Sequence, residues 1–259
     1  MPKFAANLTM LFQEAPFLER FSKARAAGFN YVEYLFPYQW DAEILSQKLL
    51  ENNLQQVLFN LPAGDWERGD RGIACIPNRK KEFKQGLELA VHYARALNVS
   101  QVNCLAGLKP ESITHDMALN TFTENLHFAA DYLYKENIQL LIEPINSLID
   151  IRGFFLDRLD MAAQIIDAVD HPNLSLQFDI YHTNIMHGNV VDQFHTYFEK
   201  ISHIQFADSP GRHEPGTGNI NFQEIFNAID RSNYDGFVSA EYIPAESSAQ
   251  SLNWLQTFN

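Results

Sequence analysis

The strongest constraint on the fold is an alternation that runs along the whole chain. Short segments rich in Val, Ile, Leu, Phe and Tyr precede longer segments with helical spacing of apolar residues, and this pattern repeats eight times. We predict strands over residues 3–8, 31–35, 55–60, 101–106, 139–144, 175–180, 203–207 and 237–242. The predicted helices cover residues 16–27, 41–51, 78–97, 115–136, 156–169, 190–198, 222–232 and 247–256.

Strands that alternate with helices favour parallel pairing, because a parallel connection needs a crossover. Eight such units in about 250 residues is the size of a (β/α)8 barrel. An open doubly wound sheet is the competing arrangement, but it usually has a Gly-rich phosphate turn after its first strand, and none is present here. No Gly/Ser linker or break in composition marks a boundary. We therefore predict an α/β fold, one TIM-barrel domain over residues 1–259.

Composition narrows the class of partner. The chain has 32 Asp and Glu against 19 Lys and Arg, a net charge of −13, which argues against a nucleic-acid partner. No segment approaches the ~20 apolar residues of a membrane helix, so no membrane partner is expected. Cys75 and Cys104 are too few for a disulfide framework, which favours a reduced, cytoplasmic location. Base rates for soluble enzymes allow a homo-oligomer.

Acidic residues follow the predicted fifth, sixth, seventh and eighth strands, where barrel enzymes carry their chemistry. They are Glu143, Asp179, Asp208 and Glu241, and no Lys or Arg lies inside these four strand segments. Buried carboxylates must be paired, protonated or metal-bound, so a divalent cation is the economical explanation. Each residue also has a structural alternative: Glu143 as an ion-paired group, Asp179 as a helix cap, and Glu241 as a solvent-exposed side chain.

Three more polar residues lie near these strand ends. Gln205 stands within an apolar strand, where a buried amide must find partners without having to be a ligand. His182 follows Asp179 closely and is a structural or a substrate-binding histidine. His203 shares a strand face with Gln205, and a core role is expected for it.

Two loops contain arginines. The segment 208–218 is crowded with Pro and Gly, and its Arg212 is the natural anchor for an acidic substrate, because guanidinium binds carboxylate bidentately. The alternative is a surface turn with an incidental Arg. The long segment 61–77 has the length of an active-site lid, and its Arg71 is a secondary candidate for anion binding.

Four segments together resemble a known family. IEPIN at 142–146, FDIYH at 178–182, HIQFADSPGRHEPGTG at 203–218 and SAEY at 239–242 are similar to hydroxypyruvate isomerases, which belong to the xylose isomerase-like barrels. The resemblance covers essentially the whole chain and is strongest to the bacterial 2-oxo-tetronate isomerase branch.

The resemblance implies a site for one divalent metal ion, with Glu143 and Glu241 also exchanging protons with the substrate. Its metal ligands would be Glu143, Asp179, Gln205 and Glu241, and its substrate-binding residues His182 and Arg212. Sugar epimerases of the superfamily have a histidine where Gln205 stands, so the ligand set here becomes all-oxygen and favours Mg²⁺ or Mn²⁺.

The implied reaction moves the carbonyl of a small sugar-derived acid through an enediolate. The expected conversions are 2-oxo-tetronate to 3-oxo-tetronate, or hydroxypyruvate to tartronate semialdehyde. A sugar 3-epimerase would use the same residues but return the proton to the same carbon. A DNA-repair endonuclease would need a His-rich, multi-metal cluster and a basic surface. A non-catalytic acid-binding barrel predicts missing ligands, whereas every expected position is filled.

Overall fold

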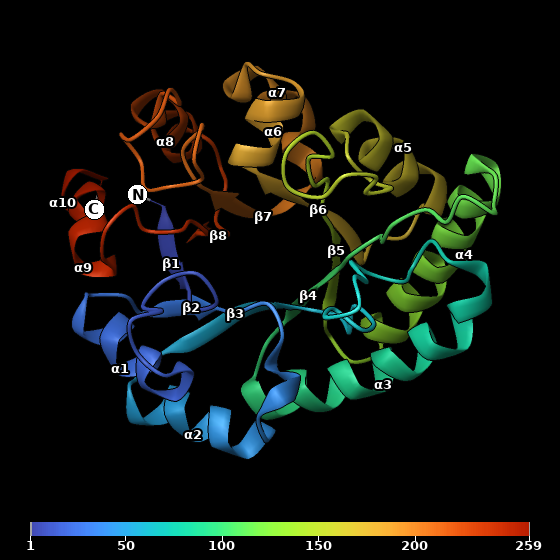
Figure 1. Cartoon of the computed structure of the whole chain (residues 1–259), viewed down its shortest axis with the longest axis horizontal. Helices are drawn as coiled ribbons and strands as arrows, with labels where there is room; N and C mark the ends of the chain where they lie inside the picture. Colours follow the sequence, from blue (N-terminus) through green and yellow to red (C-terminus); the bar gives the residue numbers. More distant parts are fainter. Residues whose placement is uncertain (1, 259) are drawn as a thin grey trace.

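The computed structural model describes residues 2–258 and shows a closed barrel of eight parallel strands. Each strand pairs with the next along the chain, and β8 pairs with β1. In Figure 1 the strands form a ring, and the helices surround it. The strands are β1 (Lys3–Asn7), β2 (Tyr31–Glu33), β3 (Gln55–Asn60), β4 (Gln101–Cys104), β5 (Gln139–Ile142), β6 (Leu174–Asp179), β7 (Ile201–Phe206) and β8 (Phe237–Ala240). The predicted (β/α)8 architecture is confirmed; residues 1 and 259, which end the predicted domain, lie outside the described residues.

The helices follow the predicted order. They are α1 (Phe17–Ala26), α2 (Ala42–Glu51), α3 (Lys80–Leu97), α4 (His115–Tyr134), α5 (Leu159–Val169), α6 (Ile180–Met186), α7 (Val190–Tyr197), α8 (Phe222–Arg231), α9 (Ser248–Ser251) and α10 (Asn253–Phe258). Three short 3-10 turns accompany them: Pro37–Gln39, Pro77–Arg79 and Phe198–Lys200.

Three helix predictions need correction. The fifth helix begins at Leu159 instead of residue 156, because the carbonyl of Leu156 accepts a hydrogen bond from the backbone N–H of Ile145 and is held outside the helix. The predicted last helix is divided into α9 and α10. The unpredicted α6 begins directly after β6, because the Asp179 side chain accepts a hydrogen bond from the backbone N–H of His182 (2.9 Å) and caps it.

The interior of the barrel changes character along its axis. Ala5, Val57, Leu58 and Leu141 form a small buried apolar cluster. Side chains two residues apart face the same side of a strand. Two positions after Ala5 and Leu141 come Asn7 and Glu143, which are buried and polar. The apolar cluster therefore supports a polar layer at the carboxyl ends of the strands. Among residues 2–258, the helices are too short or too polar to cross a membrane.

Candidate active site

A ring of buried polar side chains closes the barrel at the carboxyl ends of its strands. Each strand contributes one of them, within one residue of its carboxyl end, and each is at most 4% exposed. The members are Asn7, Glu33, Asn60, Asn103, Glu143, Asp179, Gln205 and Glu241. We call this set the polar ring. The sequence reasoning found its second half but missed Asn7, Glu33, Asn60 and Asn103.

Two carboxylates of the polar ring each have one anchored and one unpartnered oxygen. Glu143 Oε2 accepts a hydrogen bond from Asn103 Nδ2 (3.0 Å), and Asp179 Oδ1 caps α6. Glu143 Oε1 and Asp179 Oδ2 are buried without a hydrogen-bond partner within residues 2–258. Because an unpartnered buried polar oxygen is costly, these two atoms mark where another group would bind.

Glu241 has both oxygens occupied. Its Oε1 accepts hydrogen bonds from Asn7 Nδ2 (3.0 Å) and Gln205 Nε2 (3.1 Å), and its Oε2 accepts one from a terminal nitrogen of Arg212 (2.6 Å). Arg212 therefore lies at the centre of the site, not on an incidental surface turn. In this structure it neutralises the carboxylate that was predicted to transfer a proton.

Burial raises the pKa of all three carboxyl groups. The pKa of Glu143 lies well above its ordinary value, because burial is reinforced by the neighbouring Glu241 and Asp179. Burial also raises the pKa of Asp179 to about 6 and that of Glu241 to about 8, although Arg212 opposes both shifts. Closely spaced carboxyl groups of this kind share protons or bind a cation.

His182 lies beside Glu143 and Asp179 as a neutral donor. Its Nε2 is 3.9 Å from Glu143 Oε1 and 3.9 Å from Asp179 Oδ2. Burial, with Arg212 adding to it, holds the pKa of His182 well below its usual value. The three side chains form a group that could hold a metal ion, with ligand atoms within 4.8 Å of one another in the part of the chain described.

Asn146 determines which nitrogen of His182 carries the proton. Its Oδ1 accepts hydrogen bonds from the backbone N–H groups of Ile149 (2.9 Å) and Asp150 (3.0 Å), which fixes the orientation of the amide. Its Nδ2 therefore donates to His182 Nδ1 (2.7 Å). The ring proton then lies on Nε2, which faces the carboxylates as a donor.

Gln205 presents its nitrogen to the glutamates. Its Nε2 donates to Glu33 Oε1 (2.7 Å) and to Glu241, whereas its Oε1 accepts a hydrogen bond from Gln177 Nε2 (2.5 Å). A ligand role for the Gln205 oxygen would require the amide to rotate.

Glu33 and His203 form a buried pair beneath the centre of the site. His203 Nε2 lies 2.8 Å from Glu33 Oε2, and both side chains are at most 1% exposed. His203 therefore has the predicted core position. The signal for Glu33 in the sequence was the period-two pattern, since Tyr31 and Glu33 share one face of β2.

Asp208 does not belong to the polar ring, contrary to the expectation from its place after β7. It is fully buried, and its carboxylate accepts hydrogen bonds from the backbone N–H groups of Ser209, Gly216, Gly218 and Ile220. These bonds hold the loop that contains Arg212.

Arg71 makes its contacts within loop 61–77. Its guanidinium lies 4.2 Å from the centre of the Trp66 ring and donates to the backbone carbonyls of Trp66 (3.0 Å) and Asp70 (2.7 Å). The structure thus brings Glu143, Asp179, His182, Gln205, Glu241 and Arg212 together, and gives Arg71 a role within its loop.

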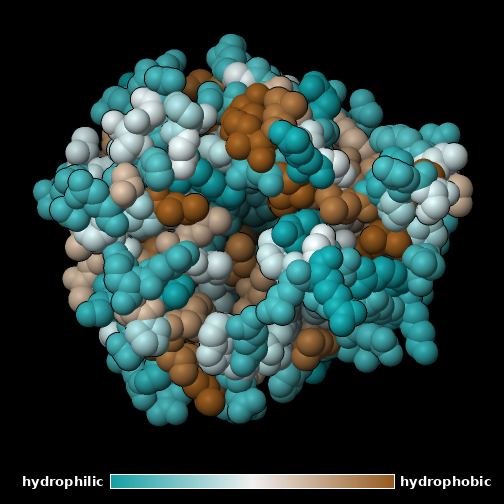
Figure 2. Space-filling model, in the orientation of Figure 1, coloured by the Kyte–Doolittle hydropathy of each residue, from teal (hydrophilic) through white to brown (hydrophobic). Residues whose placement is uncertain are grey.

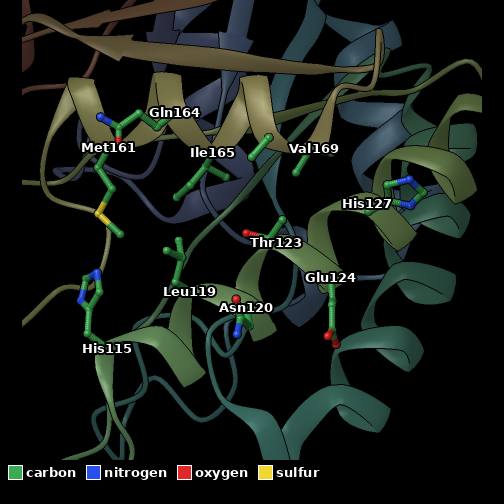
Figure 3. A pocket seen from close by; sticks show the side chains of 11 residues that line it. His115, Leu119, Asn120, Thr123, Glu124, His127, Met161, Gln164, Ile165 and Val169 are labelled. Carbon is green, nitrogen blue, oxygen red and sulfur yellow. The ribbon is translucent and has the colours of Figure 1, made fainter.

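The surface of the molecule has a hollow over the barrel (Figure 1, Figure 2). Figure 2 shows this hollow at the centre of the molecule, with hydrophobic patches around it. A separate cavity of about 670 Å³ lies between α4 and α5, outside the barrel. Figure 3 shows His115, Leu119, Thr123 and His127 on one side of it, and Met161 and Ile165 on the other. None of the polar-ring residues lines this outer cavity.

A closed barrel with buried carboxylates at the carboxyl ends of its strands is the arrangement of TIM-barrel enzymes. The sequence matches the model of the xylose isomerase-like TIM barrel family over residues 21–258, and the chain belongs to this family.

Relatives that match over their full length show which members of the family the chain is similar to. The chain is 46% identical to hydroxypyruvate isomerase of Escherichia coli over 258 residues, covering 100% of both chains. It is 40% identical to 2-oxo-tetronate isomerase of Pectobacterium atrosepticum, covering 99% of this chain and 97% of the relative. A crystal structure named AP endonuclease, family 2, from Brucella melitensis is 39% identical with a TM-score of 0.97 and full coverage of both chains. The predicted family is confirmed, and the protein is an enzyme of the isomerase class.

Proposed function

We propose that this enzyme moves the carbonyl group of a small 2-oxo acid to the neighbouring carbon through an enediolate. One observation carries the proposal: unpartnered oxygens of Glu143 and Asp179 lie in the same buried site as the guanidinium of Arg212. The first two suit a cation, and the third suits the carboxylate of a substrate.

The donor set fits one divalent metal ion. Glu143 and Asp179 would hold it through their unpartnered oxygens. Glu241 would join them once Arg212 leaves its Oε2, and Gln205 once its amide rotates. A donor set of oxygens alone favours Mg²⁺ or Mn²⁺ over Zn²⁺. A cation bound there would stabilise the negative charge that develops on the substrate oxygens.

Arg212 and His182 would orient the substrate. The Nε of Arg212 is buried without a partner in the described structure, so the guanidinium retains a free donor for a carboxylate. Binding an acid would also draw Arg212 away from Glu241 and release that carboxylate for proton transfer. The Nε2–H of His182 would donate a hydrogen bond to a substrate oxygen.

Glu143 and Glu241 would move the protons. They follow β5 and β8, so they reach the site from different parts of the barrel wall. One would remove a proton from the carbon beside the carbonyl. The other would return a proton to the former carbonyl carbon. Raised pKa values suit groups that must both accept and donate protons near neutral pH.

The names of the relatives suggest hydroxypyruvate or 2-oxo-tetronate as the substrate. Arg212 favours an acid of this kind over the neutral ketose of a sugar epimerase. The name of the Brucella structure suggests abasic DNA, but a net charge of −13 opposes binding of a polyanion.

The test is proton exchange in deuterated water with three- to six-carbon 2-oxo acids, with and without Mg²⁺ or Mn²⁺. We expect deuterium on the acceptor carbon of a substrate whose carbonyl has moved. Deuterium at the original carbon with inverted configuration would instead identify an epimerase. Cleavage of an abasic oligonucleotide without exchange in any acid would refute the isomerase assignment.

A further inference from the structure

The loop between β5 and α5 contains a short hydrogen-bonded pair that nothing in the proposed mechanism uses. Asn146 is fully buried, and its amide nitrogen donates both to Asp150 Oδ2 (2.5 Å) and to His182 Nδ1 (2.7 Å). The same residue accepts backbone N–H groups through its side-chain oxygen, so it also shapes the turn. One amide therefore fixes the loop and the histidine together.

Asp150 continues this connection to the arginine. Its second oxygen, Oδ1, accepts a hydrogen bond from Arg212 (3.1 Å), and the two side chains are 18% and 16% exposed. Arg212 also lies over the ring of Tyr181, 5.2 Å from the ring centre, and Tyr181 directly precedes His182. The contacts thus form a closed circuit from His182 through Asn146, Asp150 and Arg212 back to helix α6.

We propose that Asn146 and Asp150 are positioning residues that align Arg212, the anchor for the acid group, with His182, the hydrogen-bond donor. The inference rests on the proposed function, in which both residues contact the same substrate. Asn146 would keep the His182 proton on Nε2, and Asp150 would position the guanidinium of Arg212.

The role of Asp150 follows from the charges around Arg212. The guanidinium contacts two carboxylates, Asp150 and Glu241. Without Asp150, its remaining ion pair would be the one with Glu241, the group that must be released for proton transfer. Asp150 therefore holds part of the positive charge away from Glu241. Loss of Asp150 would weaken acid binding and also strengthen an unproductive ion pair.

The first test measures the tautomer of His182 directly and does not depend on enzymatic activity. Two-bond ¹H–¹⁵N correlations on ¹⁵N-histidine protein distinguish the two tautomers, and the His182→Gln spectrum assigns the signal. We expect an Nε2–H tautomer in the parent protein and in Asp150→Asn, and loss of this preference in Asn146→Ala. Asp157→Asn is the matched control, because Asp157 lies in the same loop but is bonded to Ser147 Oγ.

The second test reads the arginine through kinetics with hydroxypyruvate and 2-oxo-tetronate. We expect Asp150→Asn to raise KM for these acids by roughly 3- to 10-fold, the range for losing a partly exposed charged hydrogen bond. Asn146→Ala should lower kcat more than it raises KM, and Asp157→Asn should match the parent. Asp150→Glu should recover part of the lost KM.

The outcomes separate this inference from the proposed function. An unchanged His182 tautomer in Asn146→Ala, or Asp150→Asn kinetics equal to those of Asp157→Asn, would overturn the coupling. A changed tautomer in Asn146→Ala, together with a parent protein that acts on no 2-oxo acid, would support the Asn146–His182 link and refute the proposed function.

Discussion

Two buried glutamates of the polar ring should respond to the same substitution with opposite signs. Glu33 has both oxygens partnered: Oε1 by Asn7 (2.9 Å) and Gln205 (2.7 Å), and Oε2 by His203 (2.8 Å). Glu143 has one oxygen without a partner in the described part of the chain. Replacing either residue with glutamine keeps the shape and removes the charge.

The sign follows from the pKa of each group. Burial raises the pKa of Glu33, but the contacts with His203 and the hydrogen bond from the Gln205 amide outweigh burial, so the pKa lies below its usual value. Its carboxylate stabilises the fold above the unfolded pKa, and this contribution is lost as pH falls through the folded pKa. Burial and the neighbouring carboxylates hold the pKa of Glu143 well above its usual value. Glu143 therefore destabilises the metal-free fold increasingly as pH rises above its unfolded pKa.

The magnitudes differ as well as the signs. Breaking a buried charged pair costs about 3–5 kcal/mol, which we expect for Glu33→Gln. Removing the charge from a buried carboxylate that has an unpartnered oxygen relieves about 1–3 kcal/mol, which we expect as a gain for Glu143→Gln at pH 8. At about 2–4 °C per kcal/mol, Tm should fall by about 6–20 °C in the first variant and rise by about 2–12 °C in the second.

Circular dichroism melts in EDTA at pH 8 and pH 5 provide the assay. The gain in Glu143→Gln should shrink at pH 5, because the penalty builds up only as pH rises above the unfolded pKa of about 4.3, and pH 5 lies near the start of that range. Glu124→Gln is the control, because its side chain is 66% exposed and we expect little change. If the Glu33 and Glu143 variants shift Tm in the same direction at pH 8, the reasoning from hydrogen-bond satisfaction is wrong.

Three further predictions concern the metal and the substrate. Mn²⁺ at 100 times its Kd should stabilise the parent protein by about 2.7 kcal/mol in thermal melts, and a similar gain in Glu143→Gln would contradict the ligand assignment. Glu241→Gln should retain the fold by circular dichroism but lose turnover, so near-normal activity would reject its role in proton transfer. Arg212→Ala should lose kcat/KM for 2-oxo acids far more than for neutral ketoses, and an equal loss for both would rule out the anchor.

The fold could be predicted because its main determinant is local. Eight alternations of strand and helix specify a parallel barrel, and attention to the carboxyl ends of the strands led to Glu143, Asp179 and Glu241, which lie together in the polar ring. The same reasoning failed for Asp208. Side chains alternate along a strand, so Asp208, three residues after the inward-facing Gln205, would not face the barrel interior. Asp208 also lies beyond the end of β7, in the following loop.

Three of the four polar-ring residues that the sequence did not predict are asparagines. Asn7, Asn60 and Asn103 are neutral, so they raised no question of charge compensation, although each occupies the last inward position of its strand. The partners of His182 and Glu241 could not be predicted at all. Asn146 and Arg212 contact them from other loops. The spacing of residues in the sequence does not show which loops lie side by side.

The carboxylate of Asp208 has a consequence for how this enzyme spends binding energy. Four backbone N–H groups from residues 209–220 converge on it. The loop is therefore shaped by its own contacts, and the proposed binding of an acid at Arg212 would leave it little conformational entropy to lose. An insertion in this loop would separate donors that must meet at one point. For this chain, we therefore expect the loop to tolerate side-chain replacements better than a change in its length.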